Sequence, residues 1–147
     1  MINLTPEDVR LKATARSKID AIRQVGEVLV SRGRIQPGYI DSMLGRETQA
    51  NTYLGNSIAI PHGQPAQRDL IETTGIAVLQ LPAGVEWNPG EVVRLVVGIA
   101  AKSDEHLQIL TNLTHVLDDP AAVEILVNTT DARVICDRLT GQSTAGK

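Results

Sequence analysis

The chain is poor in aromatic residues and cysteine, and it has no concentration of positive charge. Aromatic side chains make up 2% of its 147 residues, so a base-stacking surface for single-stranded nucleic acid is not expected. The formal net charge is −3 and no run of Lys or Arg is present, which argues against a nucleic-acid partner in general. The single cysteine, Cys136, excludes an intramolecular disulfide and a cysteine-based zinc cluster.

Long apolar runs and targeting signals are missing as well. No apolar run in the sequence approaches the roughly 20 residues that a membrane-spanning helix requires. Residues 1–10 are polar and carry no apolar signal core. We therefore expect no direct membrane insertion and a cytoplasmic location.

The spacing of apolar residues predicts alternating helices and strands. Helices are expected over residues 17–31, 37–50, 103–117, 120–127 and 130–139, with a short helix within 63–70. Ser17 and Asp119 are the expected N-caps of the first and fourth of these helices. Strands are expected over residues 9–13, 57–60, 74–81 and 92–101. The last of these is almost continuously apolar, which is typical of a central strand covered on both faces, and the strand before it is expected to end at Pro82.

This order of elements predicts an α/β fold with a single domain, in which helices flank a mixed sheet of parallel and antiparallel strands. The segment 81–92 is too short for a crossover helix, so the strands on either side of it are expected to be antiparallel. The domain is expected to occupy residues 1–141. Residues 142–147 are small and polar and are expected to form a disordered tail.

The segment 57–63, Ser-Ile-Ala-Ile-Pro-His-Gly, places a histidine directly after a strand. Pro61 cannot donate to a sheet ladder, so the strand is expected to stop there. Gly63 lets the backbone turn away at low steric cost. His62 is therefore expected on a loop at the end of a strand, where an imidazole acts as base, ligand or nucleophile. An ordinary surface histidine is the alternative.

A second histidine, His106, follows the apolar run 92–101 in a similar way. With Ser103 as N-cap it falls at the third helical position, where backbone N–H groups without helical partners favour an anion. If the two strands are neighbours, His62 and His106 meet at one edge of the sheet. Otherwise His106 is only a polar residue at a helix start. His115 lies nine residues further on, about half a turn around the helix, and should point away.

Three other residues have simple structural interpretations. Arg46, near the end of its helix, complements the negative end of the helix dipole. Trp87 is expected in the loop between two strands, where packing and a partner contact both remain open. Cys136 is expected to be partly buried and inert.

The segment 53–63, Tyr-Leu-Gly-Asn-Ser-Ile-Ala-Ile-Pro-His-Gly, resembles a known phosphorylation-site signature. It is that of the enzyme IIA components of the bacterial phosphoenolpyruvate:sugar phosphotransferase system, in the mannitol and fructose class. The segment 94–106, with Leu113 and Asp118-Asp119 beyond it, is similar to the mannitol branch in particular. The resemblance runs from about residue 46 to about residue 139.

This resemblance implies a phosphotransferase component that works through a phosphohistidine. His62 matches the histidine that accepts a phosphoryl group from phosphorylated HPr and passes it to a cysteine of enzyme IIB, for uptake of a hexitol such as mannitol. His106 and Arg46 match the family's second histidine and its arginine, which stabilise the phosphoryl group. The family fold, a mixed sheet flanked by helices, agrees with the pattern above. No cofactor and no metal are expected.

Two other functions remain open. Related IIA-like proteins of the nitrogen type are regulators, in which phosphorylation controls binding to other proteins. A metalloenzyme that uses His62 and His106 is an alternative from a different class. The sequence has neither the HExxH spacing of a metalloprotease nor, for a hydrolytic enzyme without a metal, the Gly-x-Ser-x-Gly turn.

Overall fold

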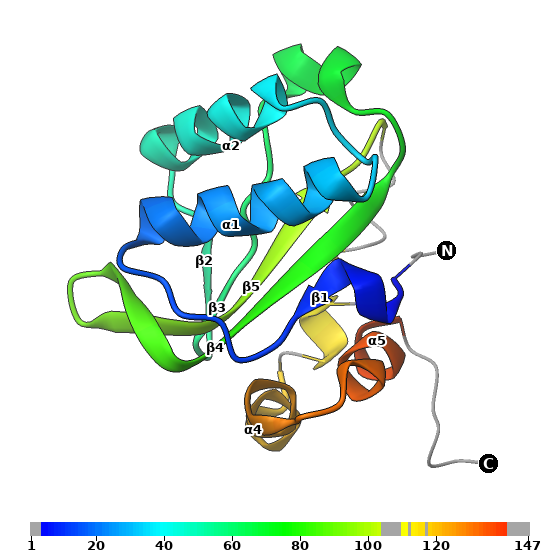
Figure 1. The fold of residues 1–147 in the computed structure, drawn as a ribbon. Helices are drawn as coiled ribbons and strands as arrows, with labels where there is room; N and C mark the ends of the chain where they lie inside the picture. Colours follow the sequence, from blue (N-terminus) through cyan, green and yellow to red (C-terminus); the bar gives the residue numbers. More distant parts are fainter. Residues whose placement is uncertain (1–3, 104–109, 112, 117, 141–147) are drawn as a thin grey trace.

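The computed structural model describes residues 4–103, 110–111, 113–116 and 118–140 (Figure 1). One sheet of five strands has the order β1-β4-β5-β3-β2. The strands are β1 (Val9–Arg10), β2 (Tyr53–Gly55), β3 (Ile58–Ala59), β4 (Gly75–Asn88) and β5 (Glu91–Ala100). Strands β4 and β5 are antiparallel, as are β2 and β3, whereas β1 pairs with β4 and β3 pairs with β5 in parallel. The predicted mixed sheet is confirmed, and β2 is a short strand that the sequence pattern missed.

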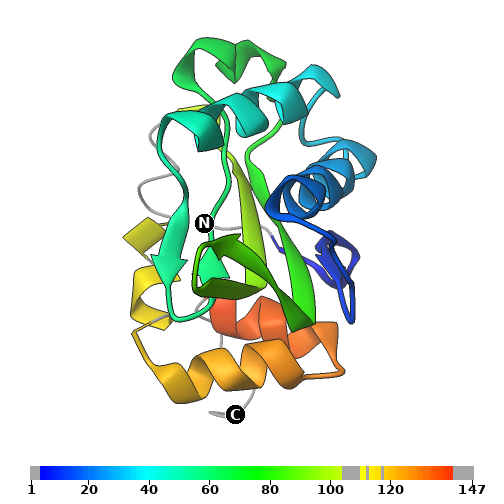
Figure 2. The same cartoon turned by 90° about the vertical axis from the view of Figure 1, so that its left-hand side faces the viewer.

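Helices cover both faces of the sheet (Figures 1 and 2). They are α1 (Lys18–Ser31), α2 (Gly38–Gln49), α4 (Pro120–Asn128) and α5 (Ala132–Thr140), with 3-10 helices η1 (Pro6–Asp8) and η2 (Pro65–Leu70). Helices α1 and α2 lie on one face, and α4 and α5 lie on the other. Residues 110–111 and 113–116 are helical, and residues 104–109, 112 and 117 of the helix expected over 103–117 lie outside the described residues. None of the described helices is both long and apolar enough to cross a membrane.

Local signals place the helix ends. The side chain of Ser17 accepts a hydrogen bond from the backbone N–H of Asp20, which caps α1 as predicted. Gly33 follows the end of α1 with a φ of 73°, a left-handed conformation that glycine adopts readily. The carboxylate of Asp119 accepts from the N–H of Ala121 at the start of α4, so this predicted cap is also confirmed.

Strand β5 runs through the centre of the core. Its side chains alternate between two apolar clusters: Val97 and Ile99 face the layer of α4 and α5, whereas Val96 and Ala100 face the layer of α1. All four are buried. The prediction of a central strand covered on both faces is therefore confirmed.

Two expectations about the β4–β5 hairpin are wrong. Strand β4 does not end at Pro82; it continues to Asn88, and Pro82 lies where the pairing register shifts between Gln80 and Val85. A proline is tolerated at such an irregularity because it interrupts the ladder of hydrogen bonds. Trp87 therefore lies on β4 rather than in a loop, and it is buried. Of its two interpretations, packing is the one that holds.

Candidate functional site

His62 lies just beyond the carboxyl end of β3, next to β5. The backbone N–H of Ile99 donates to the carbonyl of Pro61 at 3.0 Å, and His62 forms a parallel bridge with Ile99. The chain therefore continues alongside β5 after β3 itself has ended. The two strands that precede His62 and His106 are parallel neighbours, as the site hypothesis requires. His106 itself lies outside the described residues.

The imidazole of His62 is oriented by its own backbone. Its Nδ1 lies 2.9 Å from the carbonyl oxygen of Ile60. A carbonyl can only accept a hydrogen bond, so Nδ1 carries the hydrogen and the lone pair of the neutral ring lies on Nε2. His62 as a residue is half-buried.

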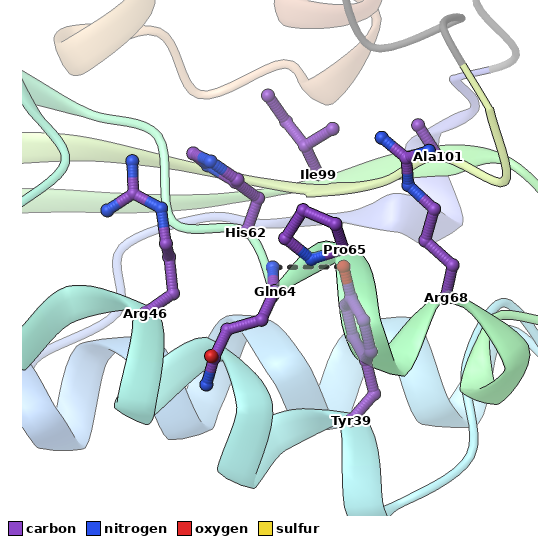
Figure 3. A pocket seen from close by; sticks show the side chains of 9 residues that line it. Tyr39, Arg46, His62, Gln64, Pro65, Arg68, Ile99 and Ala101 are labelled. Carbon is purple, nitrogen blue, oxygen red and sulfur yellow. Dashed lines mark hydrogen bonds between the residues drawn. The ribbon is translucent and has the colours of Figure 1, made fainter. Parts of the chain in front are cut away.

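His62 lines an open pocket of about 130 Å³ (Figure 3). The described residues that line this pocket include two arginines and no acidic residue: Tyr39, Arg46, His62, Gly63, Gln64, Pro65, Arg68, Ile99 and Ala101. In Figure 3 the side chain of Arg46 lies on one side of His62 and that of Arg68 on the other. The charge of the pocket therefore suits an anion.

Arg46 contacts the end of its own helix and also lines the pocket of His62. Its Nη1 donates to the carbonyl of Ala50, just past the end of α2, so the side chain complements the helix terminus. The same side chain lines the pocket beside His62. The structure thus brings together two of the three predicted site residues.

Tyr39 of α2 holds the loop that carries His62. Its hydroxyl oxygen accepts the backbone N–H of Gly63 at 2.9 Å. A Cβ added at Gly63 would lie 2.3 Å from Cζ of Tyr39, so glycine is needed here for the close approach of the ring. Burial raises the pKa of the Tyr39 hydroxyl, which keeps the phenol protonated.

Two further residues of α2 extend this contact. The Ser42 hydroxyl accepts from the backbone N–H of Gln64 at 2.8 Å and donates to Oε1 of Gln67 at 2.9 Å. Gln49 donates to Oε1 of Gln64 at 3.0 Å. Tyr39, Ser42 and Gln49 are three and seven residues apart, so they lie on one face of the helix. One polar face of α2 thus holds the loop through hydrogen bonds.

Beyond this face, a buried carboxylate fixes the end of α2. Glu47 accepts hydrogen bonds from the N–H and the hydroxyl of Thr52, at 3.0 and 2.7 Å, and from Nε1 of Trp87 at 2.9 Å. The ammonium of Lys18 lies 3.7 Å from the same carboxylate. Glu47 directly follows Arg46, so these contacts also hold the backbone that presents the arginine.

Sequence reasoning missed several of these residues. The polar spacing of Tyr39, Ser42 and Arg46 on one helix face was a usable signal, since such a face needs a polar partner. Nothing local pointed to Arg68.

Cys136 and His115 lie outside the pocket. Cys136 is buried in α5, and burial raises the pKa of its thiol to about 11. A thiol that stays protonated is a poor nucleophile. His115 is exposed on the helical residues 113–116.

Comparisons with known proteins place this geometry in a family. Residues 3–141 match the model of the family described as "Phosphoenolpyruvate-dependent sugar phosphotransferase system, EIIA 2". The chain is 62% identical over 141 residues to the multiphosphoryl transfer protein of Rhodobacter capsulatus, an alignment that covers 96% of this chain and 17% of that protein. The chain thus spans only a small part of the length of that relative.

Two solved structures share the fold closely. IIA mannitol from Escherichia coli is 41% identical, with a TM-score of 0.88 over 94% of this chain and 99% of that one. The complex of IIAMTL with phosphorylated IIBMTL from Escherichia coli matches at 40% identity and a TM-score of 0.90, covering 97% and 100%. The match over residues 3–141 and these similarities show that the chain belongs to the EIIA 2 family and is a phosphotransferase component of the phosphoenolpyruvate-dependent sugar phosphotransferase system.

Proposed function

We propose that this protein carries a phosphoryl group on Nε2 of His62. The observation that supports this most directly is the 2.9 Å contact between Nδ1 and the carbonyl of Ile60, because it puts the lone pair of the neutral ring on Nε2. The pocket around the ring is lined by Arg46 and Arg68, with no acidic group among its described lining residues. A doubly charged phosphoryl group suits that surrounding.

The transfer step needs no net proton movement. The Nε2 lone pair attacks phosphorus while the bond from phosphorus to the ring nitrogen of a donor phosphohistidine breaks. The donor ring carries a proton on its other nitrogen, so it leaves as a neutral imidazole. The His62 ring becomes positively charged, and the carbonyl of Ile60 stabilises it through the Nδ1–H. The guanidinium of Arg46 can hold equatorial phosphoryl oxygens, since catalysis of phosphoryl transfer is mostly positioning and charge stabilisation.

We propose phosphorylated HPr as the donor and a cysteine of an enzyme IIB as the acceptor. The complex of IIAMTL with phosphorylated IIBMTL, 40% identical in its IIA part, supports the acceptor. The similarity to IIA mannitol supports a hexitol as the sugar that is finally phosphorylated. His106 is proposed as a second group that stabilises the phosphoryl. The role is assigned to residues 1–141, and a carrier fed by phosphoenolpyruvate would act in the cytoplasm.

Mass spectrometry after incubation with phosphoenolpyruvate, enzyme I and HPr tests the proposal. The native protein should gain one acid-labile phosphate on His62. His62→Ala should gain none while keeping its circular dichroism spectrum, whereas the control His115→Ala should be phosphorylated normally, because His115 is exposed and does not line the pocket. Phosphate on the His62→Ala protein would remove His62 from its role.

Onward transfer tests the acceptor and the regulatory alternative together. The phosphorylated protein should pass its label to a purified IIB domain of a mannitol permease. A phosphorylated protein that transfers to no IIB domain, and instead binds other proteins according to its phosphorylation, would favour the nitrogen-type regulatory function.

A further inference from the structure

The pocket contains a second guanidinium group, that of Arg68, to which the family resemblance assigns no role. We propose that Arg68 is a further catalytic residue, whose guanidinium binds the phosphoryl group together with Arg46 while His62 carries it. This inference rests on the proposed phosphorylation of His62.

Arg68 follows His62 on the segment that is hydrogen-bonded to α2. It lies on η2 (Pro65–Leu70), which begins three residues after His62. The N–H of Gln67 donates to the carbonyl of Gln64 at 3.0 Å, and the Gln67 side chain accepts from Ser42 of α2. In Figure 3 the side chains of His62 and Arg68 extend toward the same side of the pocket. The loop therefore presents an imidazole and a guanidinium as one unit.

The Arg68 side chain makes no hydrogen bond and no ion pair among the residues that the structure describes. Other arginines that lack such a contact, such as Arg23, are exposed, and the remaining ones have a partner. Arg32 pairs with Asp8 at 2.9 Å, and Arg94 pairs with Glu124 at 3.0 Å. Arg68 is half-buried, and a partly buried guanidinium with five unused donors is suited to an anion that enters the pocket.

The charge of Arg68 acts on Tyr39, which lines the same pocket. Burial is the largest influence on Tyr39 and raises its pKa, while the hydrogen bond from the N–H of Gly63 and, after it, the charge of Arg68 lower it. Tyr39 holds the N–H of Gly63, the residue next to His62. A positive charge that influences this hydroxyl can also influence a phosphoryl group on His62.

Donor number and charge favour a phosphoryl group as the ligand. One N–H of Arg46 is already used by the carbonyl of Ala50, which reduces what that side chain can offer to three equatorial oxygens. Two guanidinium groups also balance the two negative charges of a phosphoryl dianion. Arg68 takes no part in bond making: the bond from phosphorus to Nε2 of His62 forms, the bond to the donor nitrogen breaks, and no proton moves.

Phosphorus NMR of the phosphorylated protein measures this contact directly. A positive charge close to the phosphoryl group lowers the pKa of its second ionisation, so Arg68→Gln should raise the midpoint of the phosphorus shift titration by about one pH unit. The rate of phosphorylation at saturating phosphorylated HPr should fall on the order of 10²-fold. Arg68→Lys keeps the charge without the planar fork and should lie between the two.

Arg23→Gln is the matched control. Arg23 is exposed on α1 and does not line the pocket, so the same loss of charge should leave the midpoint and the saturated rate unchanged. An Arg68→Gln protein with the native midpoint would overturn the proposal, and a loss confined to the apparent affinity for HPr would assign Arg68 to carrier docking instead. If Arg68→Gln does not fold, Arg68→Lys decides by the same two measurements. Native protein without phosphate on His62 would instead overturn the proposed function, and this inference with it.

Discussion

Helices α1 and α2 lie on the same face of the sheet but differ in what they bury. The buried residues of α1 are all apolar or glycine: Ala21, Ile22, Val25, Gly26, Val28 and Leu29. Those of α2 are mostly polar or carry a hydroxyl: Tyr39, Ser42, Met43 and Glu47. The first helix packs on the sheet, whereas the second is hydrogen-bonded to the loop that carries His62 (Figure 2). One layer of the fold thus contains one helix for stability and one for positioning.

The difference matters because the two kinds of contact tolerate change differently. Apolar burial is non-directional and adapts to small shifts. Hydrogen bonds weaken steeply when distance and angle change. Changes in α1 should therefore lower the free energy of unfolding and leave the chemistry of the folded protein intact, while changes in α2 should alter His62 first.

The largest stability effect is expected from Ile22→Ala in α1. Ile22 is fully buried, and removing a buried isoleucine side chain costs about 2–5 kcal/mol in the free energy of unfolding. Urea denaturation measures this loss. The rate of His62 phosphorylation, measured at a temperature where the variant is folded, should equal that of the native protein. If the folded Ile22→Ala protein is phosphorylated more slowly than the native protein, α1 also positions His62, and the two helices do not differ in role.

Gly63→Ala should affect the rate of His62 phosphorylation more than the free energy of unfolding. The added Cβ would lie 2.3 Å from Cζ of Tyr39, so the ring and the loop must separate and the N–H of Gly63 loses its acceptor. A displacement of about 1 Å at a reacting group can cost on the order of 10²-fold in rate, and the phosphorylation assay measures it. Gly38→Ala is the control, since its nearest neighbour is Cδ1 of Leu70 at 3.6 Å. A native rate in Gly63→Ala would show that the contact between Tyr39 and Gly63 is not needed for phosphorylation.

The smallest effect is expected from Ser42→Ala. This change removes one acceptor and one donor from the contact with Gln64 and Gln67, at a cost of about 1 kcal/mol. Amide hydrogen exchange should show faster exchange at Gln64. Thr48→Ala, exposed on the same helix, should leave that amide unchanged. Equal protection of the Gln64 amide in both variants would show that Tyr39, and not Ser42, holds the loop.

Much of the fold follows from local sequence. The caps at Ser17 and Asp119, the central strand β5 and the place of His62 after a strand were all predictable. Each depends on residues within a few positions of one another, where backbone preferences and apolar spacing act directly.

The remaining features depend on residues that are distant in the chain. Trp87 is hydrogen-bonded to Glu47, 40 residues away in the sequence, and Gly63 is hydrogen-bonded to Tyr39, 24 residues away. The spacing of apolar residues can show that one face of a helix is buried. It does not predict which polar group from a distant part of the chain will contact that helix. For the same reason only the folded chain could bring Arg68 into the pocket of His62. Local backbone preferences formed the elements, and the packing of α2 on the loop assembled the site.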